Sequence, residues 1–102
     1  MKAMETIDLD ALMKNTEAEG EGRTVVWQDS ESIAFLSRGR KRRMDFHVDP
    51  SDEVTLVLKG KQMLHCLTGN GEEKVVTMGP GQMTLCPGGV PHSPRVDDDT
   101  WF

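Results

Sequence analysis

Residues 43–60 read RMDFHVDPSDEVTLVLKG, and this stretch shows the pattern on which the whole fold is built. Its first six residues alternate in character, which predicts a strand over 43–48 with its side chains pointing to opposite faces in turn. The Asp-Pro-Ser-Asp sequence at 49–52 is a turn signal. The nearly continuous apolar run at 54–58 predicts a strand that is buried on both faces. The stretch therefore predicts two strands joined by a short turn.

The same alternation of short strand-like segments and turn signals continues in both directions along the chain. Gly69-Asn70-Gly71 is a strong hairpin signal, because Asn and Gly accept the positive φ angles that such turns need. Further strands are predicted at 24–27, 33–36, 63–67, 75–76 and 83–86. Residues 100–102 resemble the start of another strand. About eight short strands at this spacing are typical of a small all-β barrel.

The N-terminal part has a different pattern. Asp8 can cap a helix whose apolar residues fall on one face, and a Gly- and Glu-rich stretch at 17–22 ends that pattern. The predicted organisation is therefore a helix with an acidic loop over 1–22, followed by a single barrel domain over 23–102.

Composition excludes several classes of protein. The chain has 102 residues, enough for one domain, and its net charge of −5 argues against a nucleic-acid binder. No apolar run approaches the length of a bilayer span, and the N-terminus is acidic, so we expect a cytoplasmic protein with no membrane contact. Two cysteines without a CxxC spacing predict small buried side chains rather than a disulfide scaffold.

Three residues are candidate metal ligands. His47 ends one predicted strand, Glu53 opens the next across the turn, and His92 follows a distant Pro-Gly-Gly turn. Two imidazoles and one carboxylate leave open positions and suit iron(II), although Mn, Ni, Co and Zn accept the same ligands. A histidine on a strand is more often a surface or core residue than a ligand, and this is the reading for His65, which has no supporting pattern.

The spacing of these residues favours the metal site. The first segment reads His47-x5-Glu53-x6-Gly60, and the second reads Gly81-x5-Pro87-x-Gly89-x2-His92. Together these segments resemble the paired motifs of the cupin superfamily, with Asp45 in place of the first histidine. The resemblance implies a jelly-roll β-barrel that holds one divalent metal.

One cupin family shares that replacement. Trp27-Gln28-Asp29, Arg43-x-Asp45-Phe46-His47, Glu53 and Pro91-His92-Ser93-Pro94 resemble the 3-hydroxyanthranilate 3,4-dioxygenase family. The resemblance implies that His47, Glu53 and His92 hold a non-haem iron(II), which binds an aminophenol and O2 so that the aromatic ring is opened. It also implies a homodimer.

Two arginines are candidates for binding a small anionic aromatic substrate. Arg43 lies four residues before His47, so in a strand both side chains face the same side, where a guanidinium can pair with a carboxylate. It also ends a basic run at 38–43 that can attract an anion. The family has its second arginine where Val96 stands here, so Arg95, one residue earlier, is the candidate for that role.

Three functions are consistent with these features. The first is an iron(II) ring-cleaving dioxygenase, in which Arg43 acts as a catalytic and substrate-binding residue. The second is a small cupin lyase, isomerase or dehydratase without O2 chemistry, in which the metal is a Lewis acid. The third is a cupin that binds a metal or ligand without turnover.

Overall fold

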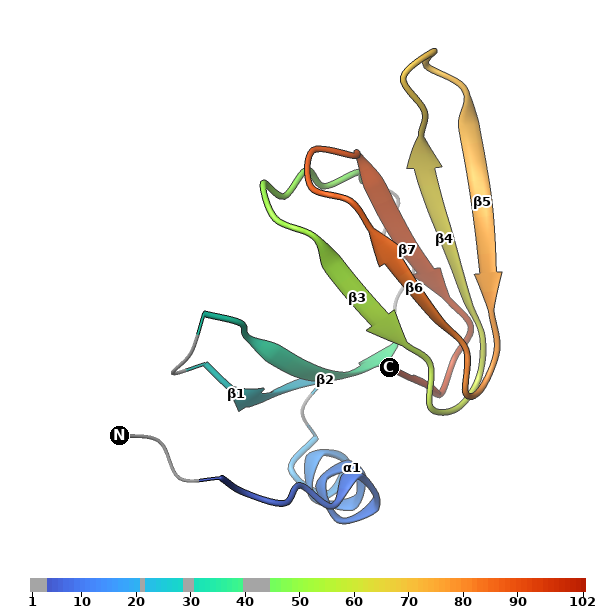
Figure 1. Ribbon diagram of the computed structural model, residues 1–102. Coiled ribbons are helices and arrows are strands. Elements are labelled where there is room, and N and C mark those ends of the chain that lie inside the picture. Colours follow the sequence, from blue (N-terminus) through green and yellow to red (C-terminus); the bar gives the residue numbers. More distant parts are fainter. Residues whose placement is uncertain (1–3, 21, 29–30, 40–44) are drawn as a thin grey trace. The chain divides into compact units, whose positions relative to one another are not determined.

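A computed structural model describes residues 4–20, 22–28, 31–39 and 45–102 of the chain (Figure 1). The chain forms two compact units, one that ends at Arg38 and one that starts at Gly39. Each unit is considered by itself. Among the described residues, no helix is long and apolar enough to cross a bilayer.

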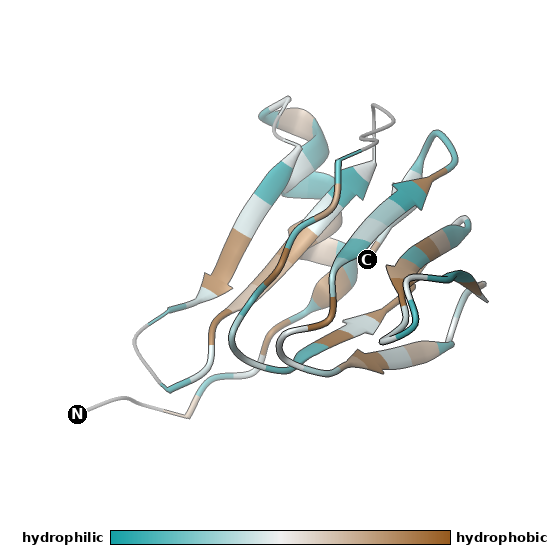
Figure 2. Cartoon of the chain, turned by 90° about the horizontal axis from the view of Figure 1, so that it is seen from above, coloured by the Kyte–Doolittle hydropathy of each residue, from teal (hydrophilic) through white to brown (hydrophobic). Residues whose placement is uncertain are grey.

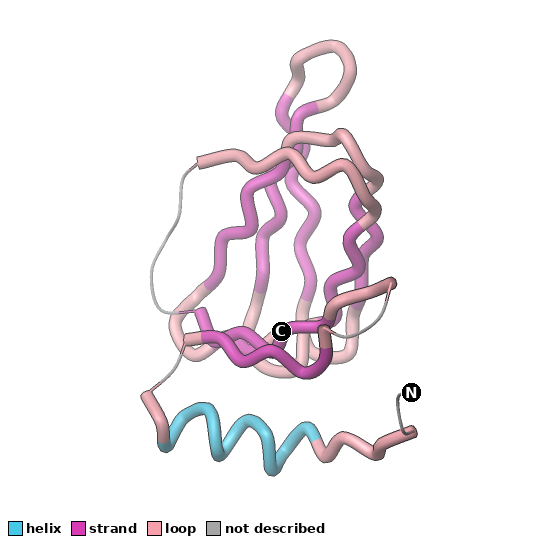
Figure 3. Tube along the Cα trace, turned by 90° about the vertical axis from the view of Figure 1, so that its left-hand side faces the viewer, coloured by secondary structure: helices cyan, strands magenta, loops and turns pink. Residues whose placement is uncertain are grey.

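The first unit contains the predicted helix and a strand pair. Helix α1 (Leu9–Ala18) begins after Asp8, whose carboxylate accepts a hydrogen bond from the Ala11 amide at 3.1 Å. This is the N-cap expected from the sequence, and it satisfies one of the amides that a helix start leaves unpaired. Figure 3 shows α1 in cyan.

A contact between the buried Thr16 and the half-buried Thr24 links α1 to the strands of the first unit. Strand β1 (Arg23–Trp27) pairs antiparallel with β2 (Ala34–Gly39). Thr16 is 1% exposed, and its hydroxyl donates to the Leu12 carbonyl and lies 2.8 Å from the Thr24 hydroxyl of β1. Because both hydroxyls are partnered, the contact can be buried without leaving an unsatisfied polar group.

Most strands of the second unit form two sheets, one of β3 and β6 and one of β5, β4 and β7, which are called the two ladders below. Strand β3 pairs antiparallel with β6, and β4 pairs with both β5 and β7. The six strands of this unit are β3 (Glu53–Leu56), β4 (Gln62–Leu67), β5 (Glu73–Met78), β6 (Met83–Cys86), β7 (His92–Val96) and β8 (Thr100–Trp101). Within this unit, β8 contacts the segment after β3 through a bridge between Trp101 and Lys59.

A glycine turn allows this bridge to form. Gly60 has φ +88°, and a Cβ built on it would lie 2.4 Å from the Thr100 hydroxyl oxygen. Only glycine combines that backbone angle with that approach. The buried Thr100 hydroxyl then accepts from the Lys61 amide and donates to the Lys61 carbonyl, both at 3.1 Å.

The two ladders pack over one small core. Val57, Leu64, Met78 and Cys86 form a buried cluster with contributions from both ladders, and Val90 and Phe102 pack against it. In Figure 2 bands of apolar colour interrupt the polar colour along the strands, as expected when one face of each strand is buried. The prediction of an all-β fold with one short N-terminal helix is confirmed.

Two local predictions are wrong. Within the described part of 43–48, only His47 makes a β-bridge, so the predicted strand is absent there. The run 54–58 is not buried on both faces, because Val54 and Leu56 are 59% and 39% exposed. They belong to a two-stranded ladder that turns one face away from the core, while Val57, just beyond the strand, is fully buried.

Candidate metal centre

The backbone places His47 directly beside His92, although 44 residues separate them in the sequence. The His47 amide donates to the His92 carbonyl at 2.7 Å, and the His92 amide donates to the His47 carbonyl at 2.9 Å. The two ring centroids are 6.0 Å apart, with the ring planes tilted by 50°. This reciprocal pair joins the two histidines through their backbones. The group of close donor atoms among the described residues, however, contains His92, Glu53 and Asp49 and not the His47 ring.

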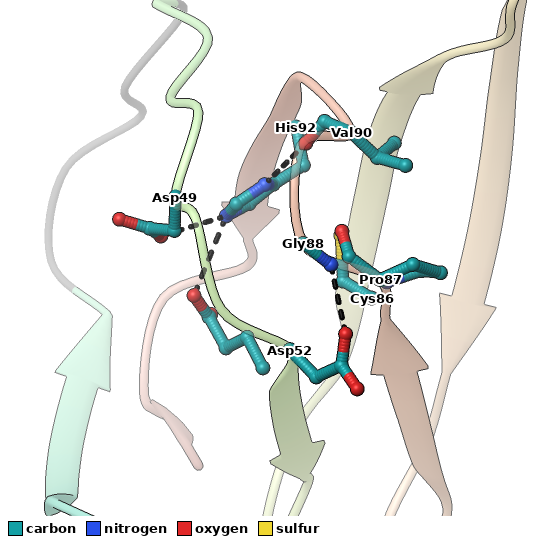
Figure 4. Close-up of polar contacts among 8 residues, drawn as sticks. Asp49, Asp52, Cys86, Pro87, Gly88, Val90 and His92 are labelled. Atoms are coloured by element: carbon teal, nitrogen blue, oxygen red, sulfur yellow. Dashed lines mark hydrogen bonds and ion pairs between the residues drawn. The ribbon is translucent and has the colours of Figure 1, made fainter.

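The surroundings of His92 determine which ring nitrogen is available to bind a metal. The ring is almost fully buried, and Nδ1 lies 3.0 Å from the Val90 carbonyl oxygen (Figure 4). Because a carbonyl oxygen can only accept, Nδ1 carries the proton, and a neutral ring presents the lone pair of Nε2. A backbone partner on the second ring nitrogen is the usual support of a metal-binding histidine.

Two carboxylates converge on that lone pair. Glu53, the first residue of β3, places Oε2 at 3.4 Å from His92 Nε2, and Asp49 places Oδ2 at 3.8 Å. The three donor atoms of these residues all lie within 4.8 Å of one another. Close acceptors of this kind repel unless a proton or a cation lies between them, and carboxylate and imidazole donors together suit a divalent transition metal. The donor set therefore fits the metal that the cupin resemblance implies.

Asp49 is the member of this cluster that the sequence pattern does not predict. The pattern predicts a turn at 49–52, because its Asp-Pro pair is a strong turn signal. The position of Asp49 between two candidate ligands is the one signal that could have identified it. The Asp49 carbonyl also accepts a hydrogen bond from the Gly89 amide at 2.7 Å, which ties this turn to the segment leading to His92.

Cys86 lies beside the cluster but keeps its proton. Burial, with a smaller contribution from the Glu53 carboxylate, raises the pKa of the Cys86 thiol above its ordinary value of 9.0. A protonated thiol is a poor metal ligand and a poor nucleophile. Its predicted role as a small buried side chain is confirmed, whereas Cys66 is only half-buried.

Of the two arginines predicted to bind substrate, the structure describes only Arg95. Arg43 lies outside the described residues. Arg95 lies in β7, where its Nε donates to the Ser93 hydroxyl at 3.4 Å and its guanidinium stands 6.0 Å from the Phe46 ring centroid. The β4–β7 register is regular over 92–96, so period-two alternation puts Arg95 on the opposite face of β7 from His92. His65 pairs with Glu73 and not with the cluster.

The arrangement of strands defines the class of the protein. Among solved structures, two mutants of Bacillus subtilis oxalate decarboxylase are similar to this chain, with a TM-score of 0.59 and 17% sequence identity. The similarity covers 68% of this chain and 19% of those chains. Together with the paired motifs around His47 and His92, it shows that the chain has a cupin fold.

Residues 1–101 match the protein family described as 3-hydroxyanthranilic acid dioxygenase, and the chain belongs to that family. It is 50% identical over 77 residues to 3-hydroxyanthranilate 3,4-dioxygenase of Bacillus thuringiensis, which covers 76% of this chain and 43% of that protein. The enzyme of the same name from Burkholderia lata is 39% identical over 74 residues, which covers 72% of this chain and 42% of that protein. The chain thus spans about two fifths of the length of these curated relatives.

Proposed function

We propose that this chain is a metal-dependent cupin that acts as a ring-cleaving dioxygenase of the 3-hydroxyanthranilate 3,4-dioxygenase type. His47, Glu53 and His92 would hold one divalent metal, with iron(II) as the preferred ion and 3-hydroxyanthranilate or a similar small anionic aromatic as the substrate. The observation that carries the proposal is the convergence of the Glu53 and Asp49 carboxylates on the buried Nε2 of His92. The names of the curated relatives supply the reaction.

An iron(II) ion at this position would supply a Lewis-acidic, redox-active centre for the reaction of the aromatic substrate with O2. The protein residues have separate tasks. The Val90 carbonyl holds the proton on His92 Nδ1 and so keeps Nε2 available as a donor. The Glu53 carboxylate offsets part of the metal charge, and its half-exposed side chain leaves the outer side of the cluster open to solvent and substrate.

Asp49 and the arginines complete the proposal. Asp49 is about as exposed as Glu53, and it is a further carboxylate that can bind the metal or accept a proton at the mouth of the site. Arg43 would orient the substrate carboxylate through a paired hydrogen bond. A substrate contact of Arg95 stays a prediction, and Arg95→Ala tests it through the KM of the reaction.

The proposal is tested by loading the purified chain with iron(II) under anaerobic conditions, adding 3-hydroxyanthranilate and then admitting air. Oxygen uptake that matches the absorbance of the ring-opened product is the expected result. His47→Ala and Glu53→Ala should abolish both uptake and iron binding, because each removes a ligand from a three-ligand site. His65→Ala is the matched control, since it removes an imidazole that is paired with Glu73 away from the cluster.

The outcomes distinguish the three functions predicted from the sequence. Iron binding without oxygen uptake would refute the dioxygenase function and favour a lyase, an isomerase or a non-catalytic cupin. Failure of the wild-type chain to bind any divalent metal would refute the metal centre itself.

We also propose a homodimer, as the family resemblance implies. The exposed apolar residues Val54, Leu56, Met83 and Leu85 of the β3–β6 ladder are compatible with such contacts. Light scattering of the purified chain, which gives the molar mass in solution, tests this directly. A cytoplasmic location stays a prediction.

A further inference from the structure

The candidate ligands lie on two ladders that share no hydrogen-bonded strand pair among the described residues. Glu53 belongs to β3, which pairs with β6, whereas His92 belongs to β7, which pairs with β4. The distance between Glu53 and His92 therefore depends on what links the ladders near the site. The core reaches this region through Cys86, the register partner of Glu53, but none of the core residues lies in the segments 49–52 and 87–89 that flank the ligands.

A close contact between two turns supplies the link. The segment 49–52 lies against the turn at 87–89, and the Asp49 carbonyl accepts from the Gly89 amide at 2.7 Å. The approach is so close that a Cβ on Gly88 would lie 2.4 Å from the Pro50 carbonyl oxygen. Asp52 completes the contact, since its Oδ1 accepts from the Gly88 amide at 2.9 Å (Figure 4).

We infer that Asp52 is a positioning residue, which sets the separation of Glu53 from His92 through its hydrogen bond to the Gly88 amide. This inference rests on the proposed metal centre and assigns to it a residue that does not touch the metal. Asp52 directly precedes Glu53, and Gly88 starts the turn that leads to His92, so the bond joins the two chain segments that carry these ligands.

The alternative, that Asp52 is only a turn former, does not account for its partner. An aspartate that stabilises its own turn accepts from an amide two or three residues further on. Asp52 instead accepts from an amide 36 residues away. It also places a third carboxylate next to those of Asp49 and Glu53, which is unfavourable by repulsion, and the charge-assisted bond to Gly88 offsets part of that cost.

The test compares cobalt(II) binding by three variants of the 102-residue chain. Asp52→Ala removes the acceptor and should weaken binding by about tenfold to a hundredfold, the usual effect of losing a residue that orients a ligand. Asp52→Asn keeps an oxygen that can accept the same bond and should bind within about threefold of wild type. Asp98→Ala removes an equal charge from an exposed turn beyond the far end of β7 and should have no effect.

Two further readouts separate positioning from a loss of fold. The visible absorption bands of bound cobalt(II) report ligand geometry and should shift in Asp52→Ala but not in Asp52→Asn. Hydrogen exchange at the Gly88 amide, measured on the metal-free protein, should be faster in Asp52→Ala only. Thermal unfolding of the metal-free proteins verifies that each variant is folded.

The inference is overturned if Asp52→Ala binds cobalt(II) with wild-type affinity and spectrum, or if Asp52→Asn weakens binding as much as Asp52→Ala. The second result would assign the effect to charge and not to the hydrogen bond. If wild type does not bind cobalt(II), the proposed function fails by itself. The inference is then tested on the metal-free protein by the hydrogen-exchange rate of the Gly88 amide and the chemical shifts of the His92 ring. If both are the same in wild type and in Asp52→Ala, the inference is overturned.

Discussion

Replacement of Gly88 by alanine should push apart the two turns that meet at the metal centre. The new Cβ would lie 2.4 Å from the Pro50 carbonyl oxygen, 2.9 Å from the Pro50 carbonyl carbon and 3.2 Å from the Ser51 carbonyl carbon. All three atoms belong to the backbone, so no side-chain rotation can relieve the contact. The turns must separate by at least 0.6 Å to reach 3.0 Å, below which Cβ contacts are essentially never seen.

This movement acts on stability and on the ligands together. Inserting a methyl group into a closely packed contact costs about 1–3 kcal/mol in the free energy of unfolding. The same movement lengthens the bonds from the Gly88 amide to Asp52 and from the Gly89 amide to Asp49. We therefore expect Gly88→Ala to lower both the free energy of unfolding of the metal-free chain and its affinity for cobalt(II).

Urea unfolding followed by circular dichroism gives the first quantity, and cobalt(II) titration followed by visible absorption gives the second. Gly69→Ala is the matched control, because a Cβ at Gly69 meets no atom within 4 Å and its φ is not in the left-handed region. That variant should be neutral, or more stable by up to about 1 kcal/mol. Equal unfolding free energies and cobalt(II) affinities for the two variants would refute the close approach of the turns.

Three further predictions concern positions elsewhere in the chain. Thr100→Val removes both hydroxyl bonds to Lys61 from a fully buried site and should cost about 1–3 kcal/mol in urea unfolding, whereas the exposed Thr77→Val should cost almost nothing. Because burial raises the pKa of Cys86, the folded chain holds the thiol proton more tightly than the unfolded chain. The free energy of unfolding should therefore fall as the pH rises through 9.0, a decline that Cys86→Ala should reduce; an unchanged slope would contradict the raised pKa. Asp8→Ala removes the N-cap of α1 and should lower stability by about 1 kcal/mol, measured by the loss of helical circular dichroism in urea.

Features that depend on local chemistry could be predicted from the sequence. The Asp8 cap and the turn at 69–71 are each specified by a few adjacent residues, and the structure contains α1 and the β4–β5 hairpin where they were expected. The spacing around His47 and His92 predicted the cupin fold for a related reason, since the motifs record a fixed arrangement of turns and strands.

Features that depend on a distant partner could not be predicted in the same way. Alternation over 43–48 suggests a strand, but a strand needs a neighbour, and in its described part only His47 has one. The apolar run at 54–58 shows that these side chains are hydrophobic, but it does not show which elements pack against them. The exposure of Val54 therefore could not be predicted. Asp49 lies in the cluster because its segment contacts the turn at 87–89 through the hydrogen bond from the Gly89 amide to the Asp49 carbonyl. No feature of the sequence predicts this contact.

The reciprocal backbone bonds between His47 and His92 bear on which ions the site would select. Both bonds belong to the main chain, so the separation of the two backbone segments does not depend on the presence of a metal. Little conformational entropy would then be lost on binding, which favours rapid loading of an already organised site. The His92 ring, which is held by the Val90 carbonyl, also adapts poorly to ions of different radius. Discrimination would therefore lie with the more exposed carboxylates of Asp49 and Glu53, which can move to suit the ion.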